Sequence, residues 1–421
     1  MTNFSDISPD PLLLDAMMKL SEAQFKSGVK LSLPDRPSIA VLPFDNLSGD
    51  AKQNYFSDGI SGDIITELSR FRSMFVIARN SSFMFRDQKI GIAEIGRLLG
   101  VHYVLEGSVR RSDNRMRIAV QLTETETARH HWAERYDRDL TDIFAIQDEV
   151  VSTIAATVAG RLDVIAMDRV KRMAAVDLGA YDYVLRGMEF LAGYGEVANA
   201  NAISMFEKAI EIAPGYAVAH AYLGLAIYVD RIGRNIVDID RALDEARIAV
   251  EIDPDDSRCQ RILAEISLES RHYERADFHS QRSLTLNPND AHAAAYRAYI
   301  LIHLGRPQEA VQWIGTAMRL NPFYPEWYRS THGDVLYSTG HHAEAVAVYE
   351  QLTKPKINSH LSVAACYSKL GDAGKVRYHV EKARLLMPDF STKSWVSSMP
   401  FARDEDRAMR MQELIEAGLP E

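Results

Sequence analysis

The feature of this sequence that most constrains its fold is a series of helical segments that each end in a proline. The endings read EIAP, EIDP, LNP, LNP and LMP, at Pro214, Pro254, Pro288, Pro322 and Pro388. Two successive spacings are 34 residues, whereas the spacing of 40 holds a short extension near Asp230 to Asp240, and the spacing of 66 contains one further repeat around Lys354. This pattern predicts six helical hairpins between Ala180 and Pro388, stacked as a solenoid.

Small side chains recur at fixed offsets within these repeats, where they allow two helices to approach closely. They are Gly224, Ala264, Ala298, Gly333 and Ala364 in the first helices, and Ala202, Ala242, Ala276, Ala310, Ala345 and Val376, then Ala209, Ala249, Ser283, Ala317 and Ala383, in the second helices. The pattern resembles the tetratricopeptide (TPR) repeat. That resemblance implies an all-α superhelix whose first helices line a groove for a partner protein or peptide.

Before the repeats, strand and helix patterns alternate. The apolar run that starts at Ser38 predicts a buried strand, and a helical period follows from about Tyr55 to Phe71. A strand near Met74 to Ala78, a helix over Ile92 to Leu99, three further β segments and a helix from about Leu140 to Leu162 come next. We therefore expect an α/β domain over residues 38–163, with a mixed sheet covered by helices on one side.

The phrases PSIAVLPFDNLSGD, YFSDGI, FVIARNSSF, LLGVHYVLEGSVRR and WAERYDRDLTDIFAIQDE resemble the TolB amino-terminal domain. This domain accompanies TPR arrays in bacterial signalling proteins, often behind a class III adenylate cyclase domain or an OmpR-type winged helix. The 37 residues before Ser38 are too few for either of these domains. The resemblance therefore implies a member of this family without its catalytic or DNA-binding domain.

The remaining segments are expected to be connectors. We predict a helix and linker over residues 1–37, a linker helix over 164–179 and a C-terminal capping segment over 389–421. A cut within 164–179 should leave two independently folded pieces, because the hydrophobic period changes there.

The net charge of −10 disfavours direct binding of nucleic acid. No apolar run is long enough to span a membrane, and no signal peptide is recognisable, so we expect a cytoplasmic protein. Cys259 and Cys366 lie far apart in helical patterns, so a structural disulfide is not expected. The sequence leaves a homo-oligomer possible.

Short motifs favour structural interpretations over catalytic ones. The string from Gly193 to Ala198 follows a helix and is interpreted as an inter-helix turn, and Asp253 to Ser257 as a repeat junction rather than a calcium loop. Arg110, Arg111, Arg115 and Arg117 flank a hairpin tip and are interpreted as a solvated edge ribbon. The pairs His130/His131 and His341/His342 have no third ligand at a suitable spacing. We expect no metal, no cofactor and no catalytic residue.

The remaining candidate site is the groove formed by the first helices of the repeats. Offsets from each terminal proline place aromatic and charged residues there, which are suitable anchors for an extended or helical peptide. They are Tyr228, Arg261, Glu265, Glu269, Tyr299, His303, Trp327, Asp334 and Tyr337. Glu265 and Glu269 lie one helical turn apart and are expected to form a shared negative patch.

The sequence thus predicts a non-enzymatic adaptor that binds a partner through the groove. Two alternatives remain open. One is a regulatory component of an adenylate cyclase system, and the other is a transcriptional regulatory protein that acts through a DNA-binding partner.

Overall fold

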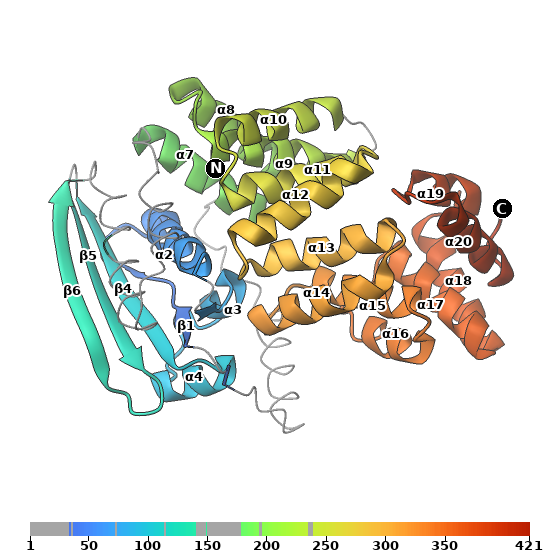
Figure 1. Cartoon of the computed structure of the whole chain (residues 1–421), viewed down its shortest axis with the longest axis horizontal. Coiled ribbons are helices and arrows are strands. Elements are labelled where there is room, and N and C mark those ends of the chain that lie inside the picture. Colours follow the sequence, from blue (N-terminus) through green and yellow to red (C-terminus); the bar gives the residue numbers. More distant parts are fainter. Residues whose placement is uncertain are drawn as a thin grey trace, which may run out of the picture.

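The computed structural model describes residues 33–34, 37–71, 74–112, 115–139, 149, 178–192, 196–234 and 239–421. They form an α/β part (residues 38–139), a helical array (residues 178–386) and two C-terminal helices, with the α/β part packed beside the array (Figure 1). The predictions for residues 1–37, 140–162 and 164–179 fall almost entirely outside the described residues, as does the turn at 193–195.

The α/β part contains a mixed sheet, as predicted. Its strands are β1 (Ser38–Val41), β2 (Asp45–Asn46), β3 (Phe75–Val76), β4 (Tyr103–Ser112), β5 (Arg115–Glu124) and β6 (His130–Asp139). The order is β3-β1-β4-β5-β6, and β2 pairs with β4. Strands β3, β1 and β4 are parallel to one another, whereas β4, β5 and β6 are antiparallel.

Helices cover both faces of the parallel half of the sheet, so the expectation of one covered side is wrong. Ile39 and Val41 of β1 pack in the same core as α2 (Asn54–Ser69). Ala40 points into a second core with α4 (Ile92–Leu99), which follows the short helix α3 (Arg79–Phe83). Parallel strands buried on both faces carry continuous apolar runs, which explains why β1 lacks alternation.

The array consists of antiparallel helix pairs that follow one another along the chain (Figure 1). The pairs are α7 (Leu178–Ala192) with α8 (Glu196–Ile212), α9 (Ala217–Arg234) with α10 (Ile239–Ile252), α11 (Ser257–Glu269) with α12 (Tyr273–Leu286), α13 (Ala291–His303) with α14 (Pro307–Leu320), α15 (Glu326–Ser338) with α16 (His342–Tyr349), and α17 (Ile357–Leu370) with α18 (Ala373–Leu386). The helices α19 (Thr392–Ser398) and α20 (Asp404–Glu416) follow. The chain therefore has a helical, TPR-like region after a mixed-sheet region.

The predicted small residues lie where helices meet. Ala202, Ala242 and Ala276 are completely buried. Gly224 of α9 approaches α10 so closely that a Cβ atom there would lie 2.7 Å from the carbonyl oxygen of Ala242. The small residues therefore set how closely the two helices of a pair approach each other.

The α/β part docks on turns between helix pairs. Asn289, in the turn between α12 and α13, is buried, and its Nδ2 lies 2.9, 3.3 and 3.2 Å from the carbonyl oxygens of Ser69, Phe71 and Met74. In the next such turn, the Ser81 hydroxyl donates to Asn321 Oδ1 at 2.6 Å. Two turns between helix pairs therefore also bind the α/β part.

The first helix of the array also belongs to this junction. Tyr181 and Leu185 of α7 lie in the core of the sheet. Asp182 accepts hydrogen bonds from the Tyr55 hydroxyl at 2.6 Å and from Arg111 Nη1 at 3.3 Å. Arg111 is thus engaged at the junction rather than solvated with its neighbours. The expectation that a cut within 164–179 leaves two independently folded pieces stays a prediction, and the shared core shows that such a cut would expose apolar side chains of α7 and of the sheet.

We predict that Gly224→Ala lowers the free energy of unfolding by about 1 to 3 kcal/mol, because its methyl group overlaps the backbone of α10. Gly315→Ala in α14 is the matched control, since nothing lies within 4 Å of the added Cβ. The control should be neutral or stabilising by up to about 1 kcal/mol, because alanine is the better helix former. Urea denaturation of both variants tests this, and equal effects would contradict it.

We predict that Asn289→Ala lowers the free energy of unfolding by about 2 kcal/mol or more. The change removes the amide that faces three buried carbonyl groups, and each unsatisfied group costs about 1 to 3 kcal/mol. Asn201→Ala, at an exposed position of α8, is the control and should change stability little. If both variants unfold at the same denaturant concentration as the parent, the proposed role of Asn289 is wrong.

Candidate functional site

The first helices of successive pairs lie against one another, α9 against α11, α11 against α13, and α13 against α15. This arrangement places them on the inner side of the array. The nine residues expected to line a groove all fall on these helices. Tyr228 lies on α9, Arg261, Glu265 and Glu269 lie on α11, Tyr299 and His303 lie on α13, and Trp327, Asp334 and Tyr337 lie on α15.

A buried charge cluster lies at the centre of this inner surface. Arg261 Nη1 is 3.6 Å from Glu265 Oε2, and Arg261 Nε is 3.9 Å from Asp290 Oδ2. Only 4% of the Glu265 side chain is exposed. Burial raises the pKa of the Glu265 carboxyl to about 7, against the lowering effect of the Arg261 guanidinium.

The expected negative patch of Glu265 and Glu269 is therefore wrong. Glu265 is buried beside Arg261, and only Glu269 of the pair is partly exposed. The one-turn spacing correctly placed both on one helix. It could not show that Asp290, from the turn before α13, also borders Arg261.

Aromatic side chains form a half-buried cluster next to these charges. The Trp327 ring stacks on His292 with centroids 5.7 Å apart, and lies 4.8 Å from the ring of Tyr296 and 4.3 Å from that of Tyr328. Sequence reasoning missed His292 and Tyr296. Their spacings from Tyr299 on α13, seven residues for His292 and three for Tyr296, are helical spacings that place side chains on one face and could have identified them.

Tyr228 and Tyr299 border Glu269 from the neighbouring helices. Both tyrosines are half-buried. Burial, together with the nearby Glu269 carboxylate, raises the pKa of Tyr228 and of Tyr299 well above the ordinary value. The Tyr299 hydroxyl lies 3.5 Å from Glu269 Oε1. The Glu269 carboxylate thus lies beside the Tyr299 hydroxyl and close enough to Tyr228 to raise its pKa.

The other predicted residues are covered by the chain itself. His303 is buried, with its ring 5.1 Å from that of Phe401. The Tyr337 hydroxyl donates to Glu413 of α20. Asp334 accepts a hydrogen bond from the Tyr349 hydroxyl at 2.5 Å, and burial raises the pKa of its carboxyl to about 6. These positions are not open groove positions in this arrangement, because the C-terminal segment folds back over His303 and Tyr337.

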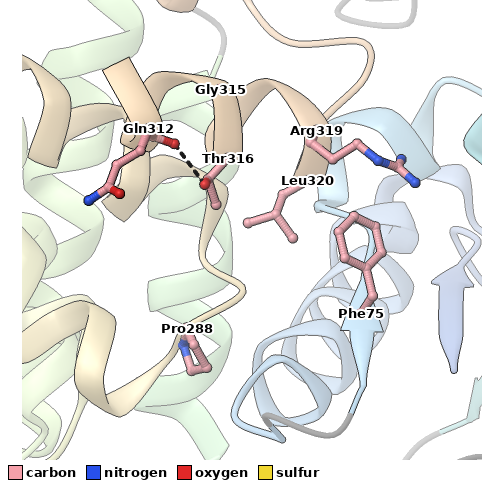
Figure 2. Close-up of a pocket in the computed structure, with 7 residues that line it drawn as sticks. All are labelled: Phe75, Pro288, Gln312, Gly315, Thr316, Arg319 and Leu320. Atoms are coloured by element: carbon pink, nitrogen blue, oxygen red, sulfur yellow. Dashed lines mark hydrogen bonds between the residues drawn. The ribbon is translucent and has the colours of Figure 1, made fainter. Parts of the chain in front are cut away.

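A hollow of about 450 Å³ lies elsewhere, at the junction of β3 and α14, and none of the nine residues lines it. Figure 2 shows Arg319 extended over Phe75 there, with its guanidinium carbon 4.9 Å from the ring centroid.

Across the described part of the chain, no three His, Cys, Asp or Glu side chains are grouped so that they could hold a metal ion. Within the same residues, no helix is long and apolar enough to cross a membrane. Cys259 and Cys366 are buried and free, as predicted.

No family model matches this chain. A protein of Rhizobium meliloti (strain 1021) named "Putative adenylate cyclase 3" is 44% identical over 236 residues, which are 55% of this chain and 40% of the relative. The chain thus spans less than half the length of that relative.

Two solved structures are also similar. YrrB, described as a TPR protein with an unusual peptide-binding site, is 19% identical with a TM-score of 0.32, covering 44% of this chain and 93% of its own. TolB from Acinetobacter baumannii is 20% identical with a TM-score of 0.24, covering 31% of this chain and 30% of its own. The TolB resemblance of residues 38–163 stays a prediction.

We predict that Glu265→Gln becomes more stable than the parent as the pH rises from about 5 to 8. The pKa of Glu265 is about 7 in the folded chain and 4.5 as a free side chain, so ionisation of the parent above pH 4.5 favours unfolding. Glutamine cannot ionise, so the difference should grow to as much as about 3 kcal/mol. Denaturation curves at several pH values test this, with Glu274→Gln on the exposed side of α12 as the control for losing one carboxylate. A difference that does not change with pH would overturn it.

Proposed function

We propose that this chain is a non-enzymatic adaptor that binds a peptide segment of a partner protein on the inner surface of α9, α11, α13 and α15. The observation that carries the proposal is the half-buried cluster of Trp327, Tyr296 and His292 beside Tyr228, Glu269 and Tyr299. Aromatic side chains that are partly exposed in an inner surface supply large contact area at low entropic cost, and such anchors dominate binding energy.

The surroundings of Glu269 favour a basic residue in the partner. A lysine or arginine side chain inserted between Tyr228 and Tyr299 would meet a carboxylate and two aromatic faces, and both contacts are attractive for a cation. The excess of acidic residues over the whole chain, with a net charge of −10, would speed encounter with a basic segment. The aromatic cluster around Trp327 would receive an apolar side chain further along the same peptide.

We predict that Trp327→Ala and Glu269→Lys each weaken capture of the partner by about 1 to 2 kcal/mol, roughly 5- to 30-fold. Trp327→Ala should also lower the melting temperature, because this ring packs on Tyr296 and Tyr328. Glu269→Lys changes a partly exposed position, so it should weaken capture of the partner with little change in the melting temperature. The partner is first identified by affinity capture and mass spectrometry, and its affinity is then measured by calorimetry.

Phe278→Ala is the matched control for this experiment. Its side chain is 63% exposed on α12, a second helix of a pair, so an aromatic ring is removed away from the inner surface. Capture should be unchanged in this variant. If Glu269→Lys and Trp327→Ala capture the partner as well as Phe278→Ala does, the inner surface is not the binding site.

A second candidate is a regulatory role in an adenylate cyclase system. The name of the Rhizobium meliloti relative, whose sequence is 44% identical over 236 residues, favours it. In this case the captured partner would carry cyclase activity, and adding the chain would change its rate of cyclic AMP formation. Both candidates use the same surface. A cyclase among the captured proteins would identify the partner class, whereas its absence would leave the first proposal standing.

A further inference from the structure

The connection between α19 and α20 reaches across the array to helix pairs distant in sequence. The backbone N–H of Ala402 donates to the carbonyl oxygen of His303 at 2.8 Å. The Tyr273 hydroxyl donates to the carbonyl oxygen of Phe401 at 2.9 Å, and Arg271 donates to that of Ser397. The segment Ser397–Arg403 is therefore held by its own backbone against the third and fourth helix pairs.

Side chains complete this contact. Phe401 is 9% exposed and packs its ring against His303, with ring planes 32° apart. Arg403 lies so close over Gly305, in the turn between α13 and α14, that a Cβ atom there would overlap its guanidinium. Backbone hydrogen bonds combined with one inserted aromatic ring are the contacts by which an extended peptide binds a protein surface.

The helix that follows continues the contact along α15 and α17. The guanidinium of Arg410, which is 8% exposed, lies 4.6 Å from the centre of the Tyr337 ring and donates to Ser362 Oγ at 2.9 Å. Glu413 accepts from the Tyr337 hydroxyl and lies 3.6 Å from Lys369 Nζ. One turn of α20 thus places a cation and an anion against the same tyrosine of the inner surface.

The segment is anchored at both of its ends, and Val396, immediately before it, is completely buried. Leu414, Ala417 and Leu419 are buried in the core of the last helix pair. Between Arg403 and Met409, by contrast, side chains are largely exposed, with Asp404 at 91% and Met409 at 53%. Release of residues 397–410 would leave the chain tethered on both sides of the segment, at Val396 and at Leu414.

Three polar atoms in this contact are left unsatisfied. They are His303 Nε2, Arg407 Nε and Arg410 Nη1, which are buried and have no hydrogen-bond partner among the residues that the structure describes. Each such group subtracts from the net stability of the closed contact, because burial removes its water without a replacement. Displacement of the segment would return the arginine atoms to water, and a partner group could then bond His303 Nε2.

We propose that residues 397–413 are an internal ligand that closes the C-terminal half of the inner surface. It is displaced by a partner segment of the same chemistry, an aromatic residue in an extended stretch followed by a helix that carries an arginine. This inference rests on the proposed function, because the same partner would extend from α13 onto this half of the inner surface. Because the internal segment is tethered, its effective concentration is high, so a partner must bring further contacts, such as those around Trp327, to compete.

A labelled peptide of residues 397–416 tests the proposal on the full-length chain. Fluorescence anisotropy should show weak binding to the parent and at least about 10-fold tighter binding to the double variant Phe401→Ala with Arg410→Ala, in which the internal copy is weakened. Phe401→Ala alone, a milder change, should give a smaller gain in the same direction. Met409→Ala is the matched control, because this side chain is exposed on the same helix, and it should bind the peptide as weakly as the parent.

Circular dichroism and melting curves establish that each variant is folded. Hydrogen exchange supplies a second readout: the backbone amide of Ala402 should exchange faster in Phe401→Ala than in Met409→Ala. A folded variant that binds the peptide no better than the parent would overturn the proposal, as would unchanged exchange at Ala402. Neither result would contradict the proposed function, because that proposal is tested separately with variants of Glu269 and Trp327 and the captured partner.

Discussion

The close approach of paired helices at small residues is the constraint on which the rest of this structure depends. Where Gly224 meets the backbone of α10, and where Ala242 and Ala276 are fully buried, no larger side chain fits between the helices. The first helices consequently gather on one side of the array and bring Tyr228, Glu269 and Tyr299 together from three different helices. The packing of buried small residues therefore forms the inner surface, and the side chains exposed on that surface do not.

Features that depend on local spacing could be predicted from the sequence. The 34-residue period, the small residues and the apolar strands β1 and β4 each depend on near neighbours in the chain, so their patterns are visible in one dimension. The nine predicted residues lie on first helices of the pairs for the same reason. Their exposure was not predictable in this way. Glu265 is buried because Arg261 pairs with it, and His303 because Phe401 lies on it.

The junction between sheet and array was missed for a related physical reason. The amide of Asn289 faces carbonyl groups more than 200 residues earlier in the chain, at Ser69, Phe71 and Met74. An asparagine in a turn is ordinary, and backbone carbonyls leave no trace in a sequence pattern. Arg111 was missed similarly, since its partner Asp182 lies beyond the α/β part. Polar contacts between distant segments produce no periodic pattern in the sequence, so only the structure reveals them.

The docking of the α/β part on the array has a mechanical consequence. Stacked helix pairs normally behave as an elastic spring, since each pair touches only its neighbours and small rotations accumulate along the stack. Here the α/β part restrains the stack, because it contacts α7 and the turns at Asn289 and Asn321. The braced pairs cannot rotate against one another without disturbing the edge of the sheet. Bending at the C-terminal end of the stack would therefore first strain the contacts of α20 with Tyr337 and Lys369.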